Sequence, residues 1–87
     1  MFRMSGALYQ DGKLLRSCVS RQSGGLSRTQ KVFAALQEIC EYLDLAVPIW
    51  LESNIREFQQ KSKTDFRADS FVEPIPFALL RIEVIEE

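Results

Sequence analysis

The dipeptide Asp11-Gly12 is the feature that most constrains the fold of this chain. It separates two segments in which apolar and polar residues alternate, as they do in half-buried strands. A two-residue type I′ turn needs positive φ at both central positions, and Asp-Gly is among the few pairs that tolerate this. The sequence therefore predicts an antiparallel β-hairpin over residues 1–22 with Asp11 and Gly12 at its tip.

The position of the turn also predicts a strand register. Gln10 is expected opposite Lys13, and Leu8 opposite Leu15. This register sorts apolar from polar side chains, which is what a sheet with one buried face requires. The expected apolar face holds Phe2, Met4, Leu8, Leu15 and Val19, and the expected polar face holds Arg3, Ser5, Ala7, Arg16, Cys18 and Ser20.

A long amphipathic helix is expected over residues 28–43. Ser27 is a suitable N-cap, and Gln30 completes a capping box three residues later. The residues that follow repeat with helical spacing and form one apolar stripe. The stripe comprises Val32, Leu36, Ile39, Cys40 and Leu43.

The second half of the chain gives weaker signals. Residues 47–51 read as a short extended run, which Pro48 confines to a sheet edge or excludes from the sheet. Ser53 is a candidate N-cap for a short helix over residues 54–60, with Ile55 and Phe58 facing inward. Residues 61–73 look irregular, and residues 77–85 alternate as a closing strand, expected at a sheet edge where a second copy could pair with it.

These elements predict one α+β domain spanning residues 1–87, in the order β-β-α-(β)-α-β. We expect a mainly antiparallel sheet of three or four strands with the long helix across one face. A chain of 87 residues can bury a core without disulfides or metal, although with a thin margin. Dimerisation is the usual remedy for a chain of this size.

The absence of histidine narrows the chemistry that the chain could perform. Histidine is the commonest general base and metal ligand, and its absence favours a non-enzymatic protein without cofactor or metal. The alternative hypothesis is a small enzyme, which would have to use carboxylates and lysine in the irregular segment. The residues available there are Lys61, Lys63, Asp65 and Asp69.

Cys18 and Cys40 lack the spacing of a redox or metal motif and fall in apolar-patterned segments. We expect both to be free thiols. Neither a signal peptide nor a membrane-spanning apolar stretch is visible. The sequence thus favours a cytoplasmic location without membrane association.

The basic residues of the N-terminal third are accompanied by a single acidic one, Asp11. Basic side chains gathered on one surface attract anionic partners. The hypothesis that follows is a nucleic-acid or anion-binding domain, with an ordinary solvated surface as the simpler alternative. The candidate basic patch consists of Arg3, Arg16, Arg21, Arg28 and Lys31.

Aromatic residues concentrate in the less regular second half. They either form a small core beside the sheet or leave a surface that a partner covers. The candidate partner surface consists of Trp50, Phe66, Phe71 and Phe77. The leading hypothesis is therefore a small interaction module that self-associates as a homodimer, with another protein as a possible partner.

Several motifs of the second half resemble a family of small uncharacterised bacterial proteins of similar length. They are Pro48-Ile49-Trp50-Leu51, Ser62-Lys63-Thr64 followed by Phe66, and the closing Ile82-Glu83-Val84-Ile85-Glu86-Glu87. The resemblance extends to the hairpin and covers nearly the whole chain. It implies no activity, ligand or catalytic residue.

Overall fold

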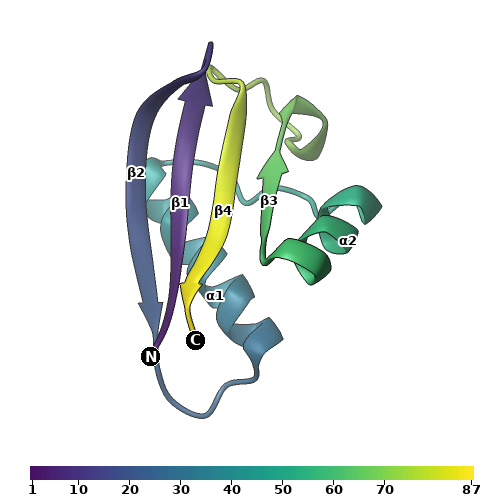
Figure 1. The fold of residues 1–87 in the computed structure, drawn as a ribbon. Coiled ribbons are helices and arrows are strands. Elements are labelled where there is room, and N and C mark those ends of the chain that lie inside the picture. The colour runs from purple at the N-terminus through teal and green to yellow at the C-terminus, as the bar shows by residue number, and fades with distance from the viewer.

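The computed structural model describes residues 1–87, which form an α+β fold of one sheet and two helices (Figure 1). This confirms the predicted fold class. The elements follow the order β1 (Phe2–Gln10), β2 (Lys13–Gln22), α1 (Arg28–Leu43), α2 (Glu52–Lys61), β3 (Lys63–Phe66), the 3-10 turn η1 (Ala68–Ser70) and β4 (Leu79–Glu86).

The four strands are all antiparallel and lie in the order β2-β1-β4-β3. β4 therefore lies inside the sheet, hydrogen-bonded to β1 on one side and β3 on the other, and the prediction of a free edge at residues 77–85 is wrong. The short strand β3 falls in the segment expected to be irregular. Residues 47–51 form no strand, although the Ile49 amide donates to the Ser70 carbonyl at 2.7 Å.

The hairpin turn is confirmed, because Asp11 and Gly12 have φ values of 53° and 76°. Gln10 pairs with Lys13 as expected, but a β-bulge then shifts the register: Tyr9 lies opposite Leu14, and Leu8 opposite Arg16. A bulge places one extra residue in one strand, so the side chains beyond it change faces. The predicted pairing of Leu8 with Leu15 is wrong for this reason.

The two faces of β2 consequently exchange their expected roles. Val19 is 43% exposed and Leu15 is also exposed, whereas Ser20 is 1% exposed. Arg16 and Cys18 share the helix-covered face with Ser20, because they lie opposite Leu8, Gly6 and Met4 of β1. Arg3 and Arg16 thus occupy opposite faces of the sheet, contrary to the sequence prediction.

The helix α1 has the predicted boundaries and covers one face of the sheet, while the other face is free of helices (Figure 1). Ser27 caps it, with both hydrogen bonds of the capping box formed to Gln30. Its apolar stripe is buried in a core shared with β1, β3, β4 and α2. The buried hydrophobic residues are Phe2, Met4, Leu8, Val32, Ala35, Leu36, Ile39, Cys40, Leu43, Phe58, Phe66, Phe77, Leu80 and Ile82.

The helix α2 packs beside β3 and begins earlier than predicted. Its N-cap is Leu51 rather than Ser53, and the Asn54 side chain accepts from the Leu51 amide at 3.1 Å. Asn54 also donates to the Thr64 hydroxyl and the Asp65 carbonyl, both at 2.9 Å. A buried amide with all these bonds ties α2 to β3. Of the two residues expected to face inward, Phe58 is buried and Ile55 is 44% exposed.

The thiols of Cys18 and Cys40 are both free, with Cys40 on the buried side of α1 and Cys18 partly covered. This agrees with the prediction of two reduced cysteines. Neither helix combines the length and apolarity needed to cross a bilayer.

Candidate functional site at the free edge of β2

The outer edge of β2 is the longer of the two edges of the sheet that have no strand beside them. β2 is ten residues long and pairs only with β1. The opposite edge of the sheet is β3, which has four residues and lies next to α2. An edge strand presents unpaired N–H and C=O groups that another strand can bind. The β2 edge is therefore the main site at which this sheet can be extended.

A groove of about 380 Å³ runs along this edge, between β2 and α1. Its floor is formed by consecutive residues 17–21 of β2, and its wall by Glu38, Ile39 and Tyr42 of α1. The Arg16 guanidinium lies 5.5 Å from the centre of the Tyr42 ring, which holds this cation against α1. The groove thus offers strand backbone and a partly apolar wall together.

The regular part of β2 is symmetric about Val19. The bulge interrupts the pairing near the hairpin tip, which leaves residues 16–22 as the uninterrupted stretch. Val19 is its midpoint and is also the midpoint of the groove floor at residues 17–21. Sequence reasoning missed Val19 as a surface residue because the bulge was not visible in the sequence.

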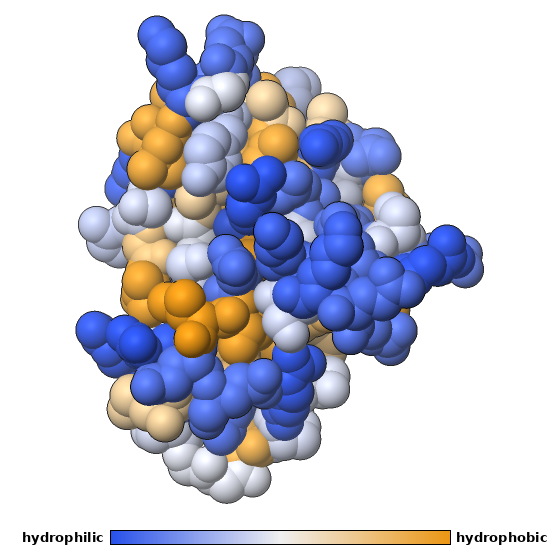
Figure 2. Space-filling model, in the orientation of Figure 1, coloured by the Kyte–Doolittle hydropathy of each residue, from blue (hydrophilic) through white to orange (hydrophobic).

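Exposed apolar side chains accompany this edge. Leu14, Leu15 and Val19 are 54%, 51% and 43% exposed, and Leu14 and Val19 lie opposite Tyr9 and Ser5 of β1. Figure 2, viewed from the uncovered face of the sheet, shows orange surface on the β2 side and mostly blue surface toward β3 and α2. Apolar surface beside an unpaired strand edge favours contact with another protein.

Cys18 lines the same groove, but its surroundings do not activate it. Burial raises the pKa of its thiol; Arg16 acts in the opposite direction, and Glu38 adds to the rise. A thiol with a raised pKa is a poor nucleophile because the reactive species is the thiolate. The groove is therefore suited to binding rather than to covalent chemistry.

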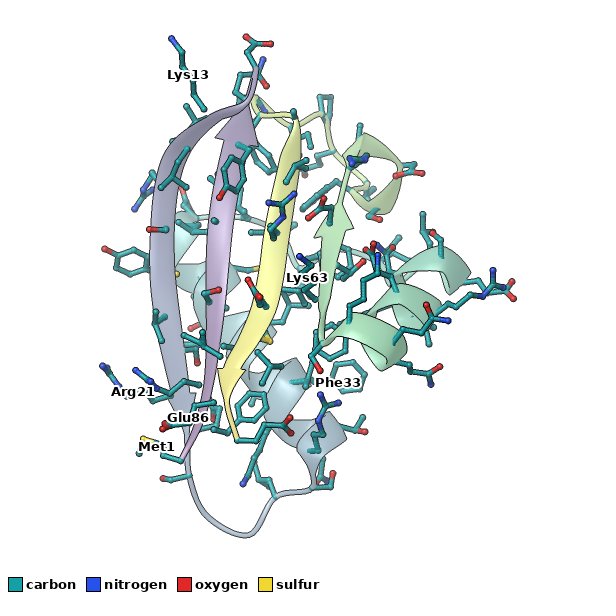
Figure 3. The ribbon with its side chains drawn as sticks, in the orientation of Figure 1. Met1, Lys13, Arg21, Phe33, Lys63 and Glu86 are labelled. Carbon is teal, nitrogen blue, oxygen red and sulfur yellow. The ribbon has the colours of Figure 1, made fainter.

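The five residues of the predicted basic patch do not meet on one surface. Arg3 and Arg21 are opposite each other on the uncovered face, where Arg3 is paired with Glu86 at 3.0 Å. Figure 3 shows Arg21 and Glu86 at one end of the hairpin and Lys13 at the other. The remaining members, Arg16, Arg28 and Lys31, lie on the helix-covered face or on α1 itself.

Two of the four residues of the predicted aromatic surface are buried in the core, and the other two are only partly buried. Phe66 and Phe77 are 0% and 6% exposed, and Trp50 and Phe71 pack against the buried cluster. The rings meet edge to face: Trp50 and Phe66 have centroids 5.0 Å apart, and Phe71 and Phe77 5.7 Å. Such pairs order the loops of the second half, and the buried rings leave no surface for a partner.

The lysines and carboxylates considered for catalysis are engaged in ion pairs or separated. Asp65 accepts two hydrogen bonds from Arg81, at 2.8 and 3.1 Å, and the pair raises the pKa of the Arg81 guanidinium. Lys63 lies opposite Glu83 on β4, whereas Asp69 lies in η1. No group of three or more Cys, Asp or Glu side chains is arranged to hold a metal ion.

No family model, curated protein or solved structure matches this chain.

Proposed function

We propose that this protein is a non-enzymatic interaction module that self-associates by pairing β2 with β2 of a second copy. The observation that carries the proposal is the free β2 edge with a groove beneath it, both centred on Val19. Pairing of two edges in antiparallel orientation generates a two-fold axis, the commonest symmetry of homo-oligomers. The two sheets then join into one.

The charges of β2 disfavour two alternative registers and are compatible with one centred on Val19. Edge strands commonly carry Lys and Arg to prevent uncontrolled pairing, and β2 carries Lys13, Arg16 and Arg21. With Val19 on the two-fold axis, Arg21 lies opposite Ser17 of the second copy and Arg16 lies opposite Gln22 of the second copy. Registers centred on Arg16 or Arg21 would place identical arginines face to face, which is destabilising.

The Val19-centred register also uses the whole uninterrupted stretch of the strand. Every residue from 16 to 22 gains a neighbour, and the side chains of directly opposite residues lie on the same face. Both α1 helices then lie on one side of the joined sheet, with Tyr42 near the seam because it borders the groove. A specific interface buries at least roughly 1,000 Å² of surface. Contacts between the helices add buried area to that of the paired strands.

A reducing compartment such as the cytoplasm suits this module. Cys18 borders the proposed seam as a free thiol, and Cys40 is also free. Reduced thiols of this kind are usual where glutathione and thioredoxin are present.

Light scattering at tens of micromolar protein tests the proposal. The chain should scatter as a species of twice its 10.0 kDa mass. Val19→Lys should return it to the monomer mass because it brings two cations together on the axis. Val72→Lys is the matched control, since Val72 is 87% exposed in the loop between η1 and β4 and does not line the groove beneath β2. A wild-type chain that remains monomeric, or a Val19→Lys variant that still dimerises, contradicts the proposal.

A further inference from the structure

A second groove lies between α1 and α2, away from the β2 edge. Its volume is about 280 Å³, near the lower end of small-molecule pockets. Apolar side chains of both helices and the connection between them line it, and Arg28 and Gln59 contribute polar groups. The apolar residues are Val32, Phe33, Trp50, Ile55 and Phe58.

Two of these apolar side chains remain open to solvent although they lie beside the core. Phe33 is 53% exposed and Ile55 is 44% exposed. The Phe33 ring meets Trp50 edge to face, with centroids 6.1 Å apart, and Figure 3 shows Phe33 beside α2. A ligand that covered both residues would remove apolar area from water, which stabilises a complex by about 25 cal/mol per Å² before the costs of association.

Arg28 adds a positive charge at the border of this apolar floor. Its guanidinium lies 5.6 Å from the centre of the Phe58 ring and donates to the Ser62 hydroxyl at 3.1 Å. Its Nε donates to the Glu87 carboxylate at 2.6 Å. The Arg28 guanidinium therefore already binds a carboxylate of the same chain. Glu87 is half-exposed, so another carboxylate can compete for the same place.

We infer that the groove between α1 and α2 binds a small amphipathic carboxylate. The apolar body of the ligand lies over Phe33 and Ile55, and its carboxylate replaces that of Glu87 on Arg28. Arginine suits this role because its planar guanidinium binds carboxylates in a fixed geometry. The modest volume of the groove limits the apolar body to a short aliphatic chain or a single ring system.

Trp50 gives a direct readout, because it is the only tryptophan of the chain and lines the groove. Octanoate should change its fluorescence saturably, and octanol should bind more weakly because it has no charge for Arg28. Arg28→Gln should weaken octanoate binding about tenfold, the effect of about 1.4 kcal/mol, and leave octanol binding unchanged. Arg56→Gln is the control, because Arg56 pairs with Glu52 on α2 and does not line the groove.

Glu87→Gln provides the complementary test. This variant keeps the arginine but removes the competing carboxylate, so octanoate should bind more tightly than to the wild-type chain. The Val19→Lys variant should bind octanoate like the wild type, which separates this site from self-association. The inference is overturned if octanoate gives no saturable change, or if its affinity is the same with and without the Arg28 charge.

Discussion

Replacement of Gly6 by alanine should destabilise the protein at the contact between the sheet and α1. Gly6 lies in β1 on the helix-covered face, and a Cβ at this position would lie 2.4 Å from Cγ2 of Ile39. Carbon atoms in optimal contact lie about 3.5–4.0 Å apart, so the overlap exceeds an ångström. The same Cβ would lie 3.2 Å from Cδ1 of Ile39, which prevents a small rotation from relieving the clash.

The size of the destabilisation depends on how little the Ile39 side chain can move. It is 1% exposed, and a β-branched side chain in a helix has one strongly preferred χ1 rotamer. Overpacking of this kind costs about 1–3 kcal/mol, and the lower chain entropy of unfolded alanine offsets about 0.4–1 kcal/mol. After this offset we expect the free energy of unfolding to fall by about 0.5–2.5 kcal/mol, measured by urea denaturation with Trp50 fluorescence.

Two further variants make this prediction specific. Gly25→Ala should have no steric cost, because nothing lies within 4 Å of the Cβ at that position. Ile39→Leu removes the Cγ2 methyl at nearly constant volume, so Gly6→Ala should cost less in that background, by a coupling of at least about 0.5 kcal/mol. If Gly6→Ala is as stable as Gly25→Ala, β1 and α1 are not packed as described.

Three other substitutions test separate parts of the fold. Asn54→Ala should lower the free energy of unfolding by about 2–4 kcal/mol in denaturant titrations, because it leaves the Thr64 hydroxyl and the Asp65 carbonyl without this donor. Gly12→Val should cost about 1–3 kcal/mol, since a β-branched residue resists the positive φ of the turn; an unaffected midpoint would contradict the turn assignment. Burial raises the pKa of Cys40 to about 11, above that of an unfolded thiol, so stability should fall as the pH rises from about 9 to 11 and Cys40→Ala should reduce that loss.

The elements with strong local signals were predictable from the sequence. The Asp11-Gly12 turn and the boundaries of α1 follow from turn chemistry and from the capping box at Ser27. In both cases the responsible residues are close in sequence, and their conformational preferences act without help from distant parts of the chain.

The features that escaped prediction depend on distant contacts. The bulge near Leu8 moves Val19 to the uncovered face, where it lies on the same face as Ser5 of β1. The four-residue strand β3 exists because β4 pairs with it, and β4 itself lies inside the sheet because β3 covers its outer edge. No local pattern around Lys63 or Phe66 predicts this arrangement. The sheet edge was therefore wrongly placed at residues 77–85.

The candidate surfaces show the same difference between what local patterns reveal and what depends on distant contacts. The clustering of aromatic residues in the second half was visible in the sequence, but the burial of Phe66 and Phe77 depends on packing of the sheet and the loops. Conversely, Phe33 is a half-exposed residue of α1, and only the position of α2 makes it part of the border of a groove.

Disulfide cross-linking across the proposed two-fold axis tests the self-association most directly. In a background with Cys18→Ser and Cys40→Ala, Val19→Cys places its thiol opposite that of the second copy. Directly opposite residues of antiparallel strands have Cα atoms about 4.5–5.5 Å apart, within the range of a disulfide. Pairing about Val19 predicts a covalent dimer for Val19→Cys and none for Arg21→Cys alone, whereas Arg21→Cys mixed with Ser17→Cys should yield a heterodimer. A Val19→Cys chain that stays monomeric under oxidation, or an Arg21→Cys chain that links to itself as readily, contradicts pairing of β2 about Val19.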